Sequence, residues 1–168
     1  MEILLSELIC NKGLPDIRLN GISVDSRKIK KGYLFVSLAG SKYEGNDFIS
    51  DALSKGAAAV ITDKPPKKNN VKDLPIFCLA NLRQDLGEYA SRFFGFPSKN
   101  MQIIALTGTN GKTSVTHFLA QVMQERRFSS GLIGSLGYGE PGRLVSADLT
   151  TPDAVSLQGI LRSLYDQG

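Results

Sequence analysis

The residues with the clearest chemical potential form the segment 107–113, whose sequence is TGTNGKT. Its two glycines let the backbone turn back on itself, so that successive N–H groups point at one concave spot. An apolar run precedes the segment and a helical pattern follows it, which is the context that a phosphate-binding loop needs. Lys112 would reach the β- and γ-phosphates of a nucleotide, and the Thr113 hydroxyl would bind Mg²⁺.

The segment departs from the general pattern G-x-x-x-x-G-K-[ST], because Leu106 stands where the first glycine belongs. The alternative interpretation is a tight glycine turn with an incidental lysine. An apolar strand, two glycines, a Lys-Thr pair and an amphipathic helix coincide here, and that coincidence favours phosphate binding.

The elements that must position this loop alternate between strand-like and helix-like patterns. Strands are predicted at 21–26, 33–38, 57–62, 76–79, 102–107 and 131–136, and helices at 2–10, 47–55, 82–94, 114–127 and 151–165. Gly56 is expected to end the second helix, and residues 63–75 are expected to form a surface loop. The alternation predicts an α/β protein.

The best candidate for a linker is the segment 95–98, GFPS, where the pattern breaks. We expect one small domain over residues 1–97 and the beginning of a second over residues 98–168. The chain has 168 residues, of which 42% are hydrophobic and 21% charged, as in ordinary globular domains. No apolar run has the length of a membrane span, and the N-terminus lacks the basic region of a secretory signal.

Charge and cysteine usage suggest a cytosolic protein. The net charge of +4 is spread along the chain, and the basic groups at 27–31 and 64–68 are interpreted as solvated loops rather than a nucleic-acid footprint. Cys10 and Cys78 stand in apolar contexts and are interpreted as reduced core thiols.

The segment 107–113 resembles the ATP-binding loop of the Mur ligase family. Upstream, VDSR at 24–27, GYLFV at 32–36 and GAAAV at 56–60 follow the order of that family's N-terminal domain. Downstream, Thr-Thr-Pro at 150–152 is similar to a substrate-binding segment of one branch. That branch, the UDP-N-acetylmuramoyl-dipeptide or MurE-type ligases, adds the third residue of the peptidoglycan stem peptide.

The resemblance implies a small N-terminal α/β UDP-sugar-binding domain, followed by the incomplete beginning of a P-loop ATPase domain. ATP and Mg²⁺ are the implied cofactors, with ATP bound by Gly108, Thr109, Asn110, Gly111, Lys112, Thr113 and Ser114. Lys112 and Thr113 are the implied catalytic residues, and Thr113 is the implied metal ligand. The implied substrate-binding residues are Val24, Ser26, Ser41, Lys42 and Tyr43 for the UDP-sugar, and Thr150 and Thr151 for the muramoyl-peptide.

The implied reaction is ATP-dependent amide formation through an acyl phosphate, in the cytoplasm. Its substrates would be UDP-N-acetylmuramoyl-dipeptide and an amino acid, either meso-diaminopimelate or lysine, with no nucleic-acid partner, no membrane insertion and a monomeric enzyme. No apolar run ending in an acidic Mg²⁺ ligand follows the loop, and we therefore expect the N-terminal portion of a larger enzyme, inactive by itself.

Several of these residues have simpler interpretations. Asp25 is typical of a turn whose side chain binds the local backbone. Thr151-Pro152-Asp153 is a good helix start, with Thr151 as N-cap, without any ligand. His117 is expected to be a partly exposed helix histidine.

Three other functions remain open at this point. The chain could belong to another Mur ligase branch or resemble a folylpolyglutamate ligase. It could also be an unrelated P-loop kinase or NTPase, or a module that binds a UDP-sugar without turnover.

Overall fold

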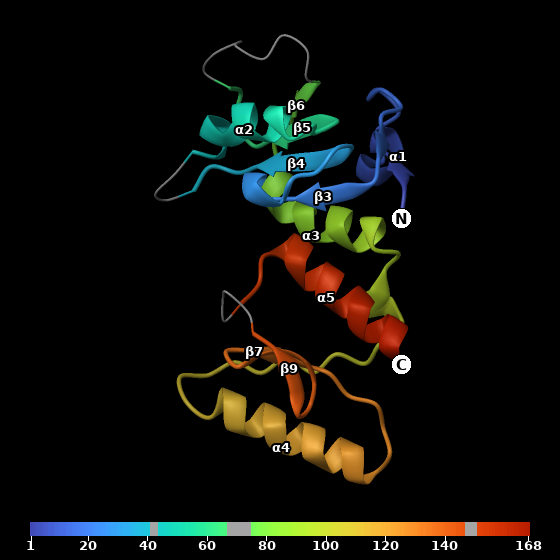
Figure 1. Ribbon diagram of the computed structural model, residues 1–168, viewed down its shortest axis with the longest axis vertical. Helices are drawn as coiled ribbons and strands as arrows, with labels where there is room; N and C mark the ends of the chain where they lie inside the picture. The colour runs from blue at the N-terminus through green and yellow to red at the C-terminus, as the bar shows by residue number, and fades with distance from the viewer. Residues whose placement is uncertain (41–43, 67–74, 147–150) are drawn as a thin grey trace. The chain divides into compact units, whose positions relative to one another are not determined.

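The computed structural model describes residues 1–40, 44–66, 75–146 and 151–168, and it forms two compact units, Met1–Gly95 and Phe96–Gly168 (Figure 1). At the boundary, Gly95 and Phe96 both have a positive φ, 74° and 56°, a conformation that is uncommon for a residue with a Cβ such as Phe96. No helix in the described ranges is long and apolar enough to cross a membrane.

The first unit is built on a four-stranded parallel sheet in the order β3-β4-β5-β6. Its strands are β3 (Gly21–Ser23), β4 (Tyr33–Ser37), β5 (Ala59–Thr62) and β6 (Ile76–Cys78). β3 is shorter than predicted, because Asp25 caps a 3-10 turn, η1 (Ser26–Lys28). The strands predicted at 33–38, 57–62 and 76–79 are confirmed, since their β-branched and aromatic residues suit a sheet buried on both faces.

Helices cover both faces of this sheet, with α2 (Ile49–Ser54) on one face and α3 (Leu82–Phe93) on the other (Figure 1). A 3-10 turn, η2 (Gly45–Phe48), precedes α2. Gly56 ends α2 as predicted: its φ is 85°, and its N–H donates to the Leu53 carbonyl at 2.9 Å.

The helix predicted at 2–10 is wrong at its start. Residues Ile3–Leu4 form β1, which pairs antiparallel with β2 (Arg18–Leu19), and only Leu5–Ile9 is helical, as α1. The Leu5 N–H donates to the Ile17 carbonyl at 2.9 Å. Pairing with this later segment keeps residues 3–4 extended. A helical pattern of apolar residues cannot reveal such pairing, because the partner lies elsewhere in the sequence.

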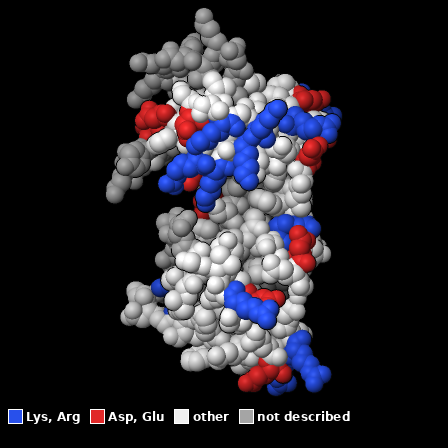
Figure 2. Space-filling model, in the orientation of Figure 1, with Lys and Arg blue, Asp and Glu red and all other residues white. Residues whose placement is uncertain are grey.

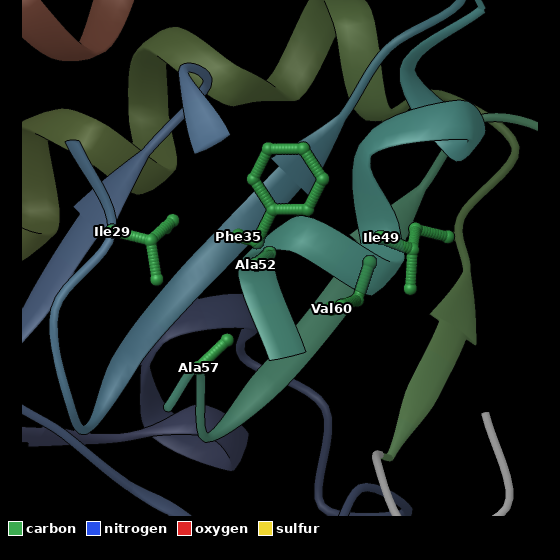
Figure 3. Packing of buried hydrophobic residues seen from close by; sticks show 6 residues of the cluster. All are labelled: Ile29, Phe35, Ile49, Ala52, Ala57 and Val60. Atoms are coloured by element: carbon green, nitrogen blue, oxygen red, sulfur yellow. The ribbon is translucent and has the colours of Figure 1, made fainter. Parts of the chain in front are cut away.

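The core between the sheet and α2 is a cluster of six buried residues (Figure 3). They are Ile29, Phe35, Ile49, Ala52, Ala57 and Val60, and the exposed fraction of each is 7% or less. Phe35 of β4 and Val60 of β5 are partners in the parallel register, so their side chains share the face that α2 covers. Burial of this apolar surface positions the carboxyl ends of the strands.

The second unit combines two helices with an antiparallel sheet in the order β7-β8-β9. Its elements are η3 (Pro97–Lys99), α4 (Lys112–Glu125), β7 (Leu132–Gly134), β8 (Gly137–Glu140), β9 (Arg143–Val145) and α5 (Ala154–Gln167). The β8–β9 hairpin was not predicted from the sequence, although Pro141-Gly142 is a turn signal. A Cβ on Gly137 would lie 2.1 Å from the Val145 carbonyl oxygen, so this strand pairing requires a glycine.

The strand predicted at 102–107 is wrong. The segment has no strand partner among the described residues, and Ile103 and Ile104 are 52% and 54% exposed. A strand exists only where a neighbouring backbone accepts and donates its hydrogen bonds, and apolar composition cannot supply that neighbour. The apolar face of α4 is likewise open, with Val115, Phe118 and Val122 at least 44% exposed.

Two further expectations need correction. The N-cap of α5 is Asp153 rather than Thr151, because its carboxylate accepts the N–H groups of Val155 and Ser156 at 2.9 and 3.0 Å. Cys10 and Cys78 are free but exposed, not core thiols. Cys10 follows the last turn of α1, and Cys78 ends the edge strand β6, so neither position faces the core.

Candidate functional site

The segment predicted to bind phosphate leads directly into α4, which begins at Lys112. Gly108 and Gly111 have φ values of 148° and 79°, a region that residues with a Cβ adopt only with strain. The first helical N–H with a backbone partner is that of Val115, which donates to the Gly111 carbonyl at 2.9 Å. The preceding N–H groups of the first turn have no side-chain cap, so this helix end is available to an anion.

The Lys112 side chain folds back over its own loop. Its Nζ donates to the Gly108 carbonyl and lies 3.4 Å from the Thr109 carbonyl oxygen. The Thr116 hydroxyl donates to the Lys112 and Thr113 carbonyls at 3.1 and 2.8 Å, which stabilises the first turn of the helix. The ammonium group thus lies over the loop, bound to its carbonyl groups.

A cavity of about 570 Å³ within the second unit brings several predicted residues together. Lys112, Thr113 and His117 of α4 line it, and so does Thr151, which comes just before α5. The remaining wall is largely apolar and includes Ile104. A concave, mostly apolar cavity with a few polar groups is typical of small-molecule sites. Thr150 lies outside the described residues.

The described residues could supply only part of the ligand set of a magnesium ion. Within the described ranges, no group of three His, Cys, Asp or Glu residues could hold a metal ion. The exposed Thr113 offers one hydroxyl oxygen in the first turn of α4. Mg²⁺ commonly keeps several waters and takes its other ligands from substrate phosphates, so a single hydroxyl is compatible with it.

Two of the residues predicted to bind a UDP-sugar, Val24 and Ser26, lie in the first unit where a parallel strand ends. Val24 and Ser26 follow β3, and the chain between β4 and η2 contains Ser41, Lys42 and Tyr43, which lie outside the described residues. Ligands of open parallel sheets bind outside the carboxyl ends of the strands. Because β3 and β4 are parallel neighbours, Val24 and Ser26 lie beside the carboxyl end of β4.

Ser26 is buried, with 6% of its surface exposed, and it is tied to α2 by two residues that the sequence analysis missed. Lys55 donates from Nζ to the Ser26 carbonyl at 3.1 Å and to Asp51 at 2.8 Å. Hydrogen bonds from Lys55 and from the Ser26 side chain lower the pKa of Asp51. The four-residue spacing of Asp51 and Lys55 on a helix is the signal that indicates such a pair.

Asp25 takes the turn role that its sequence context indicates. Its carboxylate accepts the Arg27 N–H at 2.9 Å and pairs with the Arg27 guanidinium at 2.8 Å. The pKa of Asp25 lies below its ordinary value of 3.8, and the hydrogen bond from the Arg27 side chain is the largest cause. The pair fixes the turn between Val24 and Ser26.

We expect the Asp25→Asn substitution to make the stability of the chain less sensitive to acid. The folded-state pKa of Asp25 lies below the unfolded value, so its contribution is complete above that value and is lost as the pH falls through the folded pKa. Between about pH 5 and pH 2, the wild type should lose about 0.2–1 kcal/mol more than the variant, because Arg27 is largely exposed. Urea unfolding at both pH values measures this difference, and a larger acid loss in the variant contradicts it.

The surface of the first unit carries a gathering of basic side chains. Figure 2 shows Lys and Arg residues together on the displayed face of this unit, with some Asp and Glu residues directly beside them. Such a surface attracts anionic small molecules at a distance.

Comparison with known proteins identifies the class. The model of the Mur ligase family, catalytic domain, matches residues 18–93, and that of the Mur ligase middle domain matches residues 106–168. The chain belongs to the Mur ligase family. The predicted family and α/β fold class are confirmed, and an unrelated P-loop kinase is excluded.

Curated relatives with the same name match most of this chain. The UDP-N-acetylmuramoyl-L-alanyl-D-glutamate–2,6-diaminopimelate ligase of Rhizobium meliloti is 44% identical over 154 residues, covering 90% of this chain and 30% of that protein. The ligase of the same name from Coxiella burnetii is 40% identical over 160 residues, covering 94% of this chain and 33% of that protein. The chain thus spans about a third of the length of these relatives.

Solved structures show the same fold. A UDP-N-acetylmuramoyl-L-alanyl-D-glutamate–2,6-diaminopimelate ligase matches with a TM-score of 0.83 and 28% identity, over all of this chain and 34% of that one. MurF from Acinetobacter baumannii matches with a TM-score of 0.57 and 22% identity, over 89% of this chain and 28% of that one, and shares the fold alone.

Proposed function

We propose that the chain carries the sugar-nucleotide-binding and ATP-binding parts of a ligase that adds the third amino acid to UDP-N-acetylmuramoyl-L-alanyl-D-glutamate. Residues 1–97 would bind the sugar nucleotide, and residues 98–168 would begin the ATP-binding domain. The observation that carries this proposal is the single cavity lined by both Lys112 and Thr151. Because the relatives are named for 2,6-diaminopimelate, we propose that amino acid rather than lysine.

The proposed reaction forms an amide in two steps. The glutamate carboxylate attacks the γ-phosphorus of ATP, which gives an acyl phosphate and releases ADP. The amine of the incoming amino acid then attacks the acyl carbon, phosphate leaves, and the amine proton passes to solvent. In such a mechanism the protein contributes mainly positioning and neutralisation of charge.

This chain's own residues would act on the phosphates. The Lys112 ammonium would exchange its contacts with the Gly108 and Thr109 carbonyls for oxygens of the β- and γ-phosphates. The free N–H groups at the start of α4, with Gly111 and Ser114 beside them, would bind the same phosphates. Mg²⁺, when bound by the Thr113 hydroxyl and the phosphates, would supply further neutralisation of negative charge.

The sugar nucleotide would bind at the carboxyl ends of β3 and β4. Val24, Ser26 and residues 41–43 are the proposed contacts. The buried position of the Ser26 side chain, and its engagement with Asp51, favour contact through the backbone of this turn. We further propose a monomeric, cytoplasmic enzyme whose partners are small molecules.

Calorimetric titration tests the proposal. We expect the chain to bind UDP-N-acetylmuramoyl-L-alanyl-D-glutamate saturably at one site, and ATP with Mg²⁺ at another. UDP-glucose, which lacks the lactoyl dipeptide, serves as the control and should bind more weakly. A chain that is folded by circular dichroism but binds no sugar nucleotide would falsify the sugar-nucleotide assignment.

A further inference from the structure

Residues 38–39, which follow β4, pair with residues 44–45, which lead into η2. We call these two paired segments the neck. Ala39 and Glu44 form an isolated antiparallel bridge, and the Gly45 N–H donates to the Leu38 carbonyl at 3.1 Å. A Cβ on Gly45 would lie 2.6 Å from both the nitrogen and the oxygen of Leu38. The two sides of the neck are therefore in direct contact.

Two charged residues from later elements hold the backbone of Ala39. Asp63, which follows β5, accepts the Ala39 N–H with both carboxylate oxygens, at 3.0 and 3.2 Å. Arg83, in the first turn of α3, donates to the Ala39 carbonyl, and its Nη2 lies 3.4 Å from Asp63 Oδ2. Both polar groups of one backbone residue are thus bound by an Asp and an Arg that pair with each other.

A separate, uncharged network holds the other side of the neck. Asn46 Oδ1 accepts the hydroxyls of Ser37 and Thr62 at 2.7 and 2.9 Å, and its Nδ2 donates to the Lys64 carbonyl at 2.9 Å. Ser37 and Thr62 are 1% and 0% exposed and are the last residues of β4 and β5. This network anchors the neck to the sheet, so the charged pair can be altered while the anchor stays in place.

We propose that Asp63 and Arg83 are positioning residues for the sugar nucleotide, because they fix the Ala39 backbone at the carboxyl end of β4. The inference rests on the proposed function. Val24 and Ser26 follow the neighbouring strand β3, so a ligand that spans these strand ends meets the neck. The Asp63 and Arg83 side chains are 15% and 57% exposed, so Arg83 in particular adds little to the apolar core.

The test compares the wild type with Asp63→Asn, Arg83→Met and a control, Arg18→Met. Asp63→Asn retains one oxygen for the Ala39 N–H but removes the charge, and Arg83→Met retains the aliphatic stem. Arg18 forms an ion pair with Glu2 in the same unit, and the side chains of both residues are more than half exposed. Affinities for UDP-N-acetylmuramoyl-L-alanyl-D-glutamate and for ATP with Mg²⁺ are measured by calorimetry, alongside amide hydrogen exchange of Ala39 and Val60.

We expect both neck variants to bind the sugar nucleotide about tenfold more weakly, to bind ATP within about twofold of the wild type, and to exchange the Ala39 amide faster. The control should change none of these. Neck variants that bind the sugar nucleotide like the wild type overturn the inference. A loss of sugar-nucleotide affinity that comes with faster amide exchange of Val60 in the core of the first unit also overturns it, because it indicates unfolding of that unit. An equal loss of ATP affinity overturns it as well, because it indicates general unfolding. If the folded wild type itself binds no sugar nucleotide, the proposed function is overturned. This outcome is distinguishable from failure of the inference about the neck, because it is seen without any substitution.

Discussion

Replacing Lys112 by methionine is expected to weaken ATP binding by about 10- to 100-fold, with little change in the melting temperature of the chain. Hydrogen bonds from a charged donor contribute about 1.5–3 kcal/mol, and the methionine keeps the aliphatic stem while losing the ammonium. Among the residues that the structure describes, that ammonium contacts carbonyls of its own loop, so we expect the fold not to depend on it. Calorimetric titration with ATP and Mg²⁺ measures the loss.

The matched control for this substitution is Arg143→Met, which removes an exposed positive charge from β9 of the same unit. Its ATP affinity should stay within about twofold of the wild type, because screening weakens the effect of distant surface charges. The sugar-nucleotide affinity should be unchanged in both variants. Equal losses of ATP affinity in Lys112→Met and Arg143→Met would show that net charge, rather than the loop, governs nucleotide binding.

The largest effect on stability is expected from Phe35→Ala. Phe35 is 1% exposed and lies in β4 among the buried residues of Figure 3. Removing its ring takes away buried apolar surface and leaves a cavity, which costs about 3–5 kcal/mol. For a unit of this size the melting temperature should fall by roughly 12–40 °C. Urea and thermal unfolding measure both quantities.

Phe48→Ala provides the comparison within the same unit. Phe48 is 40% exposed, so its truncation should cost about 1 kcal/mol or less. ATP binding by the Phe35→Ala variant, measured at a temperature where the first unit is unfolded, also tests whether the second unit folds independently. A Phe35→Ala protein as stable as Phe48→Ala would contradict the assignment of the core.

Local physics was sufficient to predict much of this fold. β4 and β5 follow from runs of β-branched and aromatic residues, and α3 follows from its apolar period. Gly56 at the end of α2 and the glycine loop before α4 were predictable, because positive φ favours glycine. Each of these features depends on residues that are close together in the sequence.

What could not be predicted depends on partners that are distant in the sequence. The backbone of residues 3–4 is extended because β2 pairs with it, whereas residues 102–107 have the composition of a strand but no strand partner in the described part of the chain. The hydrogen bonds of Asp63 and Arg83 with the Ala39 backbone join residues 24 and 44 positions apart, and no periodic pattern in the sequence indicates them.

The sequence alone was sufficient to predict the family and the α/β class, and it nominated the glycine loop and Lys112 as a candidate phosphate site. Glycine conformation, helix starts and lysine chemistry are local properties, which is why a sequence can indicate them. The shared cavity of Lys112 and Thr151 and the hydrogen bond from Lys55 to the Ser26 carbonyl became visible in the three-dimensional structure alone. Hydrogen bonds and burial between distant segments depend on how the chain packs, and that packing is settled jointly by all of the residues that take part in it.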